Sequence, residues 1–138
     1  MQSKLNPYIN FNGNAKEVIE FYKTVFGGKL TMSTFKEGGV PVGPADADKI
    51  MHAMLVADNN NMILMASDIP PEVAYNPGTN ISISLSGDNE EELKKYWNRL
   101  FDGAKITMPL AMAPWGDTFG MLVDKFGISW LVNIAGKK

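Results

Sequence analysis

The fold is decided by residues 12–32, NGNAKEVIEFYKTVFGGKLTM, because a related stretch, GDNEEELKKYWNRLFDGAKITM, follows at residues 87–108. In both stretches an asparagine stands three residues before a glutamate, and apolar residues then recur at helical spacing up to a glycine. This pattern is typical of a capped amphipathic helix that leads into a strand. Such a repeat inside 138 residues predicts two copies of one supersecondary motif that bury their faces together.

Strand-like segments flank both stretches. Ile9 and Phe11 alternate with polar residues before the first stretch, as Ile83 and Leu85 do before the second. The residues that alternate with them are Tyr8 and Asn10 in the first copy and Asn80, Ser82 and Ser84 in the second. We expect the apolar residues to pack against the helices, which turns the other residues toward the opposite face of each sheet.

Each copy is therefore predicted to be a βαβββ module. The first module takes up about residues 4–68 and the second about residues 80–135, with a proline-containing connection at residues 69–79. The predicted fold is a single α+β domain over residues 1–138. Its two modules form a curled, mostly antiparallel eight-stranded sheet around a cleft, with the helices outside. The polar segment at residues 36–49 is either a binding loop or a mobile connection.

Composition excludes several classes of protein. The 13 basic and 15 acidic side chains give a formal charge of −2, which predicts neither a nucleic-acid partner nor attraction to a membrane surface. The absence of cysteine excludes disulfides, thiolate nucleophiles and cysteine-ligated metals. No apolar run has the length of a signal peptide or a membrane-spanning helix, so we expect a cytoplasmic protein.

Several motifs occur in a characteristic order. They are PYINF at residues 7–11, FGG at 26–28, IMHA at 50–53, WGD at 115–117 and DKFG at 124–127. With them the chain resembles, over nearly its whole length, the PhnB-like branch of the vicinal oxygen chelate superfamily. That superfamily includes glyoxalase I, bleomycin-resistance proteins and extradiol dioxygenases. The resemblance implies a cleft for a small molecule, commonly a homodimer, and a branch that carries the name of a demethylubiquinone methyltransferase.

The resemblance also implies a divalent metal held by histidine or glutamate from the first and last strands of each module. The matching positions carry Asn6, Leu64, Asn80 and Leu131. Leucine cannot coordinate a metal, and two amide oxygens alone make a poor site for a divalent ion. We therefore expect no metal and no other cofactor.

His52 is the only histidine and the one candidate catalytic residue, because imidazole exchanges protons near neutral pH. Two interpretations stay open at this point. His52 is either a structural strand residue, or it faces the cleft as a general base, a ligand donor or a lone metal ligand. Its counterpart in the second copy is Phe119.

The predicted ligand-binding residues combine apolar side chains with a few hydrogen-bonding groups, as small-molecule sites do. They are Tyr8, Asn10, Met54, Leu64, Asn80, Ser82, Ser84, Trp115, Phe119 and Leu131. Trp115 in a loop fits either stacking on a planar ligand or a dimer interface.

The predicted function is to bind or transform a small, partly apolar or aromatic compound without a metal, and whether the protein is an enzyme stays open. The alternatives are a metal-dependent enzyme of the glyoxalase or dioxygenase type and a drug-sequestering resistance protein. Methyl transfer is disfavoured because the sequence lacks a strand, glycine-rich turn and helix for S-adenosylmethionine, and Gly27 and Gly28 end a helix.

Overall fold

The computed structural model describes residues 3–59, 62–70 and 72–136. Contacts between residues group the chain into two compact units, residues 1–76 and residues 77–138. In the described ranges no helix is long and apolar enough to cross a membrane.

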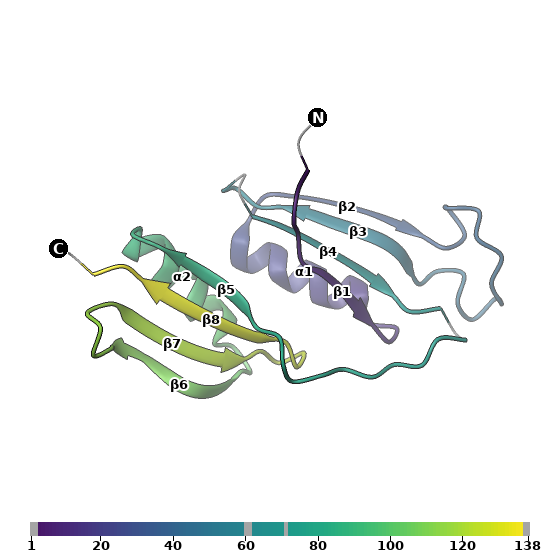
Figure 1. Ribbon diagram of the computed structural model, residues 1–138. Helices are drawn as coiled ribbons and strands as arrows, with labels where there is room; N and C mark the ends of the chain where they lie inside the picture. The colour runs from purple at the N-terminus through teal and green to yellow at the C-terminus, as the bar shows by residue number, and fades with distance from the viewer. Residues whose placement is uncertain (1–2, 60–61, 71, 137–138) are drawn as a thin grey trace. The chain divides into compact units, whose positions relative to one another are not determined.

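The first unit contains one helix and four strands (Figure 1). In chain order they are β1 (Tyr8–Phe11), α1 (Ala15–Phe26), β2 (Lys29–Thr34), β3 (Ile50–Val56) and β4 (Ile63–Asp68). The strands lie side by side in the order β1-β4-β3-β2. The pair β1 and β4 is parallel, and the other two pairs are antiparallel. Helix α1 contacts β2, β3 and β4.

The second unit repeats this arrangement. Its elements are β5 (Ile83–Gly87), α2 (Glu90–Leu100), β6 (Lys105–Met112), β7 (Thr118–Val123) and β8 (Ser129–Ile134). The strand order is β5-β8-β7-β6, and again only the pair that includes the first strand of the unit is parallel. Helix α2 contacts β5 and β8.

The predicted α+β class and the two βαβββ modules are confirmed. The eight strands form two four-stranded sheets, each with one parallel pair, where the sequence predicted one sheet. The division between the units falls inside the predicted connection at residues 69–79, of which residue 71 lies outside the described residues. The first strand of each unit begins about three residues later than predicted, at Tyr8 and Ile83.

Each helix buries one apolar stripe against its own sheet. In α1 the buried residues are Ala15, Val18, Ile19, Tyr22, Val25 and Phe26, and in α2 they are Leu93, Tyr96, Trp97 and Leu100. Phe101, which the sequence pattern included in the second stripe, follows α2 and is 52% exposed. The sheets contribute fully buried residues such as Leu55 in the first unit and Trp130 in the second.

The two helices begin differently, although the sequence predicts the same cap for both. The side chain of Asn89 accepts a hydrogen bond from the backbone N–H of Glu92 at 3.0 Å, as predicted for α2. Asn14 makes no such bond with its side chain, so the predicted capping box of α1 is wrong.

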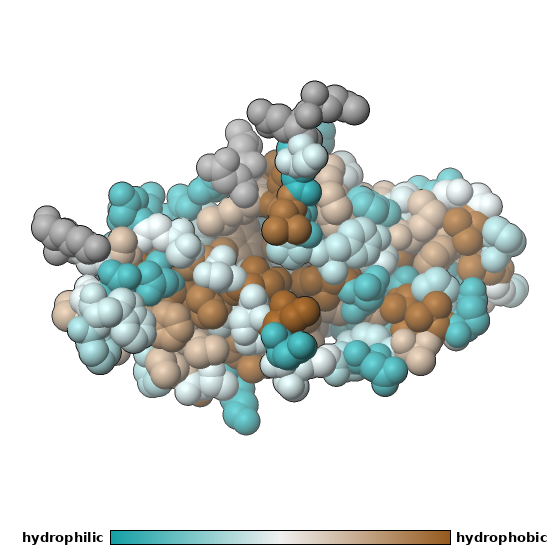
Figure 2. All heavy atoms as spheres, viewed as in Figure 1, coloured by the Kyte–Doolittle hydropathy of each residue, from teal (hydrophilic) through white to brown (hydrophobic). Residues whose placement is uncertain are grey.

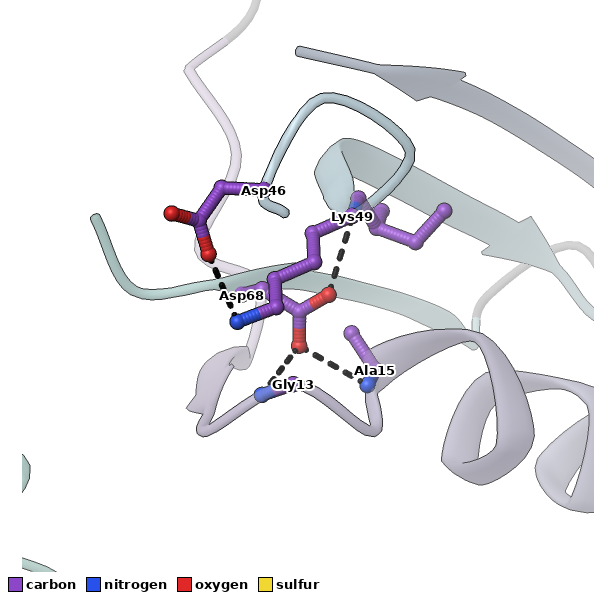
Figure 3. Close-up of polar contacts among 6 residues, drawn as sticks. Gly13, Ala15, Asp46, Lys49 and Asp68 are labelled. Atoms are coloured by element: carbon purple, nitrogen blue, oxygen red, sulfur yellow. Dashed lines mark hydrogen bonds and ion pairs between the residues drawn. The ribbon is translucent and has the colours of Figure 1, made fainter. Parts of the chain in front are cut away.

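The missing cap of α1 is supplied by Asp68 from the end of β4. One carboxylate oxygen of Asp68 accepts hydrogen bonds from the N–H groups of Gly13 (2.9 Å) and Ala15 (3.0 Å), and the other accepts one from Ile50 (2.9 Å) (Figure 3). Asp68 is only 2% exposed. This carboxylate therefore joins the start of α1 to the start of β3.

We expect Asn89→Ala to lower the free energy of unfolding by about 1 kcal/mol, because it removes a side-chain cap. The matched variant Asn14→Ala should change it by less than about 0.5 kcal/mol, since the Asn14 side chain caps nothing. Urea denaturation followed by far-UV circular dichroism measures both changes. Equal losses in the two variants would contradict the assignment of the caps.

The segment between β2 and β3 is closed by hydrogen bonds. The N–H of Phe35 donates to the Lys49 carbonyl and that of Lys36 to the Ala47 carbonyl, both at 3.0 Å. The backbone N–H of Thr34 donates to the Glu37 carboxylate, and this bond and the Thr34 side chain lower the pKa of Glu37. At the other end, a hydrogen bond and ion pair with Asp46 raise the pKa of Lys49. The loop at residues 36–49 is thus pinned at both ends.

Asp124 holds the turn between β7 and β8 in the second unit. Its carboxylate accepts hydrogen bonds from the N–H groups of Phe126 (2.9 Å) and Ile128 (3.0 Å) and from the indole N–H of Trp130 (2.9 Å). Asp124 is 4% exposed. Its acceptor oxygens are thus engaged within the turn and its neighbouring strand.

Candidate functional site

Alternation along the strands separates two faces in each sheet. In the first unit Ala53, Leu55 and Ala66 are almost fully buried on the face that α1 covers. Their neighbours His52, Met54 and Met65 therefore point to the opposite side, which we call the helix-free face. The question of which face His52 occupies, open from the sequence, is answered by this register.

An apolar row crosses the helix-free face of the first unit. Its members stand opposite one another on β2, β3, β4 and β1 and are Thr31, Met54, Met65 and Tyr8. Directly opposite residues have their side chains on the same face and in contact range. The thioethers of Met54 and Met65 therefore lie between the hydroxyl of Thr31 and the phenol ring of Tyr8.

A polar row lies beside the apolar row. Ser33 stands opposite His52, and Asn10 stands opposite Ser67. The pairing of Ala53 with Ala66 brings His52 and Ser67, the next residues along, to the same level. The hydroxyl of Ser67 donates a hydrogen bond to the side-chain oxygen of Asn10 at 3.1 Å.

His52 contacts Tyr8 through its ring. The two ring centroids are 5.7 Å apart with an angle of 65° between the planes, which is an edge-to-face arrangement. No hydrogen bond to another described residue holds the imidazole. The contact with Tyr8 places the His52 imidazole beside the apolar row.

The second unit carries a matching apolar row. Its members are Met108, Met121, Leu131 and Ser84, on β6, β7, β8 and β5. In the view of Figure 1 these strands lie in front of α2, and Figure 2 shows from that side hydrophobic atoms that reach the surface between polar ones. Met108 is 46% exposed.

The row that matches the polar row of the first unit consists of Ala111, Phe119, Asn133 and Ser86. Two of its members are apolar, but we keep the name polar row for it. The amide nitrogen of Asn133 donates to one oxygen of Asp117 at 3.0 Å, and the N–H of Gly136 donates to the other at 2.8 Å. Phe119 therefore occupies the place that His52 occupies in the first unit, as the repeat predicts.

Trp115 lies in the turn between β6 and β7 and contacts Phe119. Their ring centroids are 5.6 Å apart with 66° between the planes. Trp115 is 60% exposed. Each helix-free face thus carries one edge-to-face ring pair, Tyr8 with His52 and Trp115 with Phe119.

Two predicted ligand-binding residues, Leu64 and Asn80, lie elsewhere. Leu64 stands opposite Leu55 and is 7% exposed, so it belongs to the helix-covered face. In the strand register Leu131 corresponds to Met65. The sequence repeat had aligned Leu131 with Leu64, one residue away, and a shift of one residue moves a strand side chain to the other face of the sheet. Asn80 precedes β5 and is not in the sheet. Ser82 also precedes β5, but its hydroxyl bonds that of Ser129 at 2.8 Å, and Ser129 is on the same side of β8 as Leu131.

Sequence reasoning missed Met65, Ser67 and Asn133. All three lie on the last strand of a unit, where apolar and polar residues do not alternate strictly. The signal that finds them is the strand register, since each stands opposite a residue on the helix-free face.

The residues at the implied metal positions do not fit a divalent ion. Of the positions named from the sequence, Asn6 and Asn80 precede the first strands, and Leu64 lies on the helix-covered face. The helix-free faces of the first and last strands present instead Tyr8, Met65, Ser84 and Leu131, which offer no carboxylate and no imidazole. Within the described ranges, no three histidine, aspartate or glutamate side chains come together as a ligand group.

Comparison with known proteins gives a consistent result. The model of a family described as 3-demethylubiquinone-9 3-methyltransferase matches residues 3–133. Protein PA1353 from Pseudomonas aeruginosa has 37% identity and a TM-score of 0.82, covering 99% of this chain and 100% of that one. A putative 3-demethylubiquinone-9 3-methyltransferase, PhnB protein, from Bacillus cereus has 26% identity and a TM-score of 0.75, with 96% and 100% coverage. A glyoxylase/bleomycin resistance protein/dioxygenase domain from Frankia shares the fold at 15% identity, with a TM-score of 0.65 and 99% coverage of both chains.

Proposed function

The chain belongs to the family described as 3-demethylubiquinone-9 3-methyltransferase, a PhnB-like branch of the vicinal oxygen chelate superfamily, and on that basis we propose that it binds a small, neutral, partly aromatic compound. The proposed binding surfaces are the helix-free faces of the two units, and no metal takes part. The homodimer that the resemblance implies stays a prediction.

The observation that carries this proposal is the apolar row on each helix-free face. Met54 and Met65 form its centre in the first unit, and Met121 and Leu131 in the second. Methionine is flexible and polarizable, so it adapts to flat apolar ligands. An apolar centre flanked by a few neutral hydrogen-bonding groups is the usual composition of a small-molecule site.

Binding without a metal follows from the donors. Met65 and Leu131 stand where the superfamily implies acidic or imidazole ligands. A thioether is a soft ligand that suits monovalent copper better than the divalent ions of glyoxalases, and leucine has no donor. The metal-dependent alternative is therefore not proposed.

Methyl transfer, which the family description names, is not proposed either. An S-adenosylmethionine site in an α/β fold needs free N–H groups where a strand meets a helix. At the start of α1 the N–H groups of Gly13 and Ala15 already donate to the Asp68 carboxylate. Gly27 ends α1 and so cannot form such a turn.

A second candidate function is catalysis with His52 as proton carrier. The position of His52 on the helix-free face, with its ring against Tyr8, favours this candidate. A general base must reach the proton that it removes, and a residue on this face meets that condition for a bound ligand.

A ligand screen tests the proposal. We expect neutral bicyclic aromatic compounds to raise the melting temperature and to shift amide signals of Met54, Met65, Met121 and Leu131 in heteronuclear NMR spectra. S-adenosylmethionine and zinc, included in the same screen, should leave those signals unchanged. Saturable binding of S-adenosylmethionine, or one equivalent of zinc in the purified protein, would contradict the proposal.

His52→Phe separates binding from catalysis, because it installs the residue that the second unit has at the matching position. For a binding protein we expect the affinity for a screened ligand to change less than about threefold, since the ring is retained. For an enzyme, turnover should fall by about 100-fold or more while affinity survives. His52→Ala is the companion variant that also removes the ring.

A further inference from the structure

We propose that Asn10 makes the helix-free face of the first unit selective for a carbonyl oxygen. The ligand class would be a neutral compound with a planar ring that bears a ketone group. This inference rests on the proposed function and specifies its ligand.

The first step of the argument is the orientation of the Asn10 amide. The Ser67 hydroxyl donates to the Asn10 side-chain oxygen at 3.1 Å, and Ser67 is only 7% exposed. A hydroxyl that is shielded from water keeps such a partner, because losing it leaves a buried donor unsatisfied. The amide oxygen is therefore engaged, and the amide nitrogen with its two N–H groups points away from Ser67.

The second step is that these N–H groups are available. Among the described residues, the only side-chain hydrogen bond of Asn10 is the one with Ser67. Asn10 is exposed on β1, two residues from Tyr8 and on the same face. A ligand that lies on the apolar row would thus meet a hydrogen-bond donor at its edge.

The third step concerns charge. The eight residues of the two rows include no aspartate, glutamate, lysine or arginine. A neutral ring fits the thioethers of Met54 and Met65 without leaving a charge away from water, whereas an ionised ligand would lose hydration without gaining an opposite charge. The group that suits a neutral N–H donor is a carbonyl oxygen.

The second unit provides a contrast inside the same chain. There one N–H of the Asn133 amide donates to Asp117, which turns the amide oxygen away from Asp117. The polar row of the second unit therefore offers an acceptor, and it would favour a hydroxyl. Two repeat-related faces thus carry opposite hydrogen-bonding character, each fixed by a partner in its own unit.

The test uses three probes that differ in one group: acetophenone, 1-phenylethanol and ethylbenzene. Heteronuclear NMR titration gives a dissociation constant for each probe and reports the side-chain NH₂ signals of Asn10 directly. We expect acetophenone to bind the first unit about three- to tenfold more tightly than ethylbenzene and to move the Asn10 NH₂ signals downfield.

Asn10→Asp is the decisive variant, because a carboxylate accepts the Ser67 hydroxyl proton but cannot donate to a ketone. We expect it to abolish the preference for acetophenone over ethylbenzene. Asn10→Ala, which adds no charge, should do the same. Asn14→Ala, in the same unit but on neither row, is the control and should leave the preference unchanged.

The outcomes separate the two proposals. Equal binding of the three probes, or a preference that persists in both Asn10 variants, would overturn the carbonyl assignment and leave the proposed function standing. If no probe shifts a residue of either helix-free face, both proposals fail. Signals of the first-unit face that change with protein concentration, and not with probe, would identify a second copy of the chain as the occupant and overturn the assignment too.

Discussion

Gly28→Ala is expected to unfold the first unit or to cost more than about 4 kcal/mol of its stability. Gly28 joins α1 to β2 with a φ of +96°. A Cβ atom there would overlap the carbonyl oxygen of Val56 and would lie 2.6 Å from the Cα of Ala57. Val56 is the last residue of β3, which pairs with β2, and Ala57 follows it directly, so neither backbone moves without disturbing the ladder.

Two glycines serve as controls for this variant. Gly116 has nearly the same φ, +95°, and Gly39 lies in the first unit with a φ of +72°, but a Cβ at either position meets nothing within 4 Å. Their alanine variants should cost only about 1 kcal/mol, the price of a left-handed backbone at a residue with a side chain. The difference between Gly28→Ala and these controls isolates the close approach of the two strands.

The measurement must follow the two units separately. All three tryptophans, at positions 97, 115 and 130, lie in the second unit, so their fluorescence reports that unit. Backbone amide signals of β3 and β4 report the first. For Gly28→Ala we expect the first-unit signals to collapse at low urea. An unchanged first-unit transition would show that the approach of Gly28 to Val56 is not required.

Local patterns predicted much of this fold because both the helices and the first strands of the repeated motif are amphipathic. Alternation along β1 predicted that Tyr8 and Asn10 lie on one face of the strand and Ile9 and Phe11 on the other. The register confirms this. The helical spacing of apolar residues predicted the stripe that α1 buries. Helix and strand periods are properties of a short window, so the sequence carries them directly.

The candidate site was less predictable because its geometry comes from pairing between strands. Leu64 and Met65 are both apolar, and only the pairing of Leu64 with Leu55 reveals which one faces the helix. Ser67 matters through Asn10, a residue 57 positions away in the chain. A slip of one residue in such a pairing reverses the face, and no local pattern in Ile63–Asp68 prevents it.

The cap of α1 shows the same limit in a helix. Asn14 with Glu17 has the spacing of a capping box, yet the N–H of Ala15 is satisfied by Asp68, 53 positions later. A carboxylate at the end of a distant strand competes successfully with a local amide because it satisfies three N–H groups at once and carries a full negative charge at the helix N-terminus.

Because Asp68 accepts three backbone hydrogen bonds, we expect its replacement to destabilise the first unit strongly. Asp68→Ala should lower the free energy of unfolding of the first unit by about 3 to 5 kcal/mol, because it leaves the N–H groups of Gly13, Ala15 and Ile50 without an acceptor in a site that is 2% exposed. Far-UV circular dichroism and the amide signals of α1 and β3 measure the loss in urea.

Asp68→Asn distinguishes lost hydrogen bonds from lost volume, since it keeps the shape of the side chain. Its oxygen can still accept from Gly13 and Ala15, but its NH₂ group then faces the N–H of Ile50, donor against donor, which should cost about 2 to 3 kcal/mol. Asp46→Asn is the matched control. It breaks the ion pair of Asp46 with Lys49, whose side chain is 39% exposed, so it should cost much less than either change at Asp68. If Asp68→Asn were as stable as the unmodified chain, the carboxylate would not be what joins α1 to β3. The expected order of loss, Asp68→Ala above Asp68→Asn above Asp46→Asn, follows from the number of buried N–H groups that each change leaves without an acceptor.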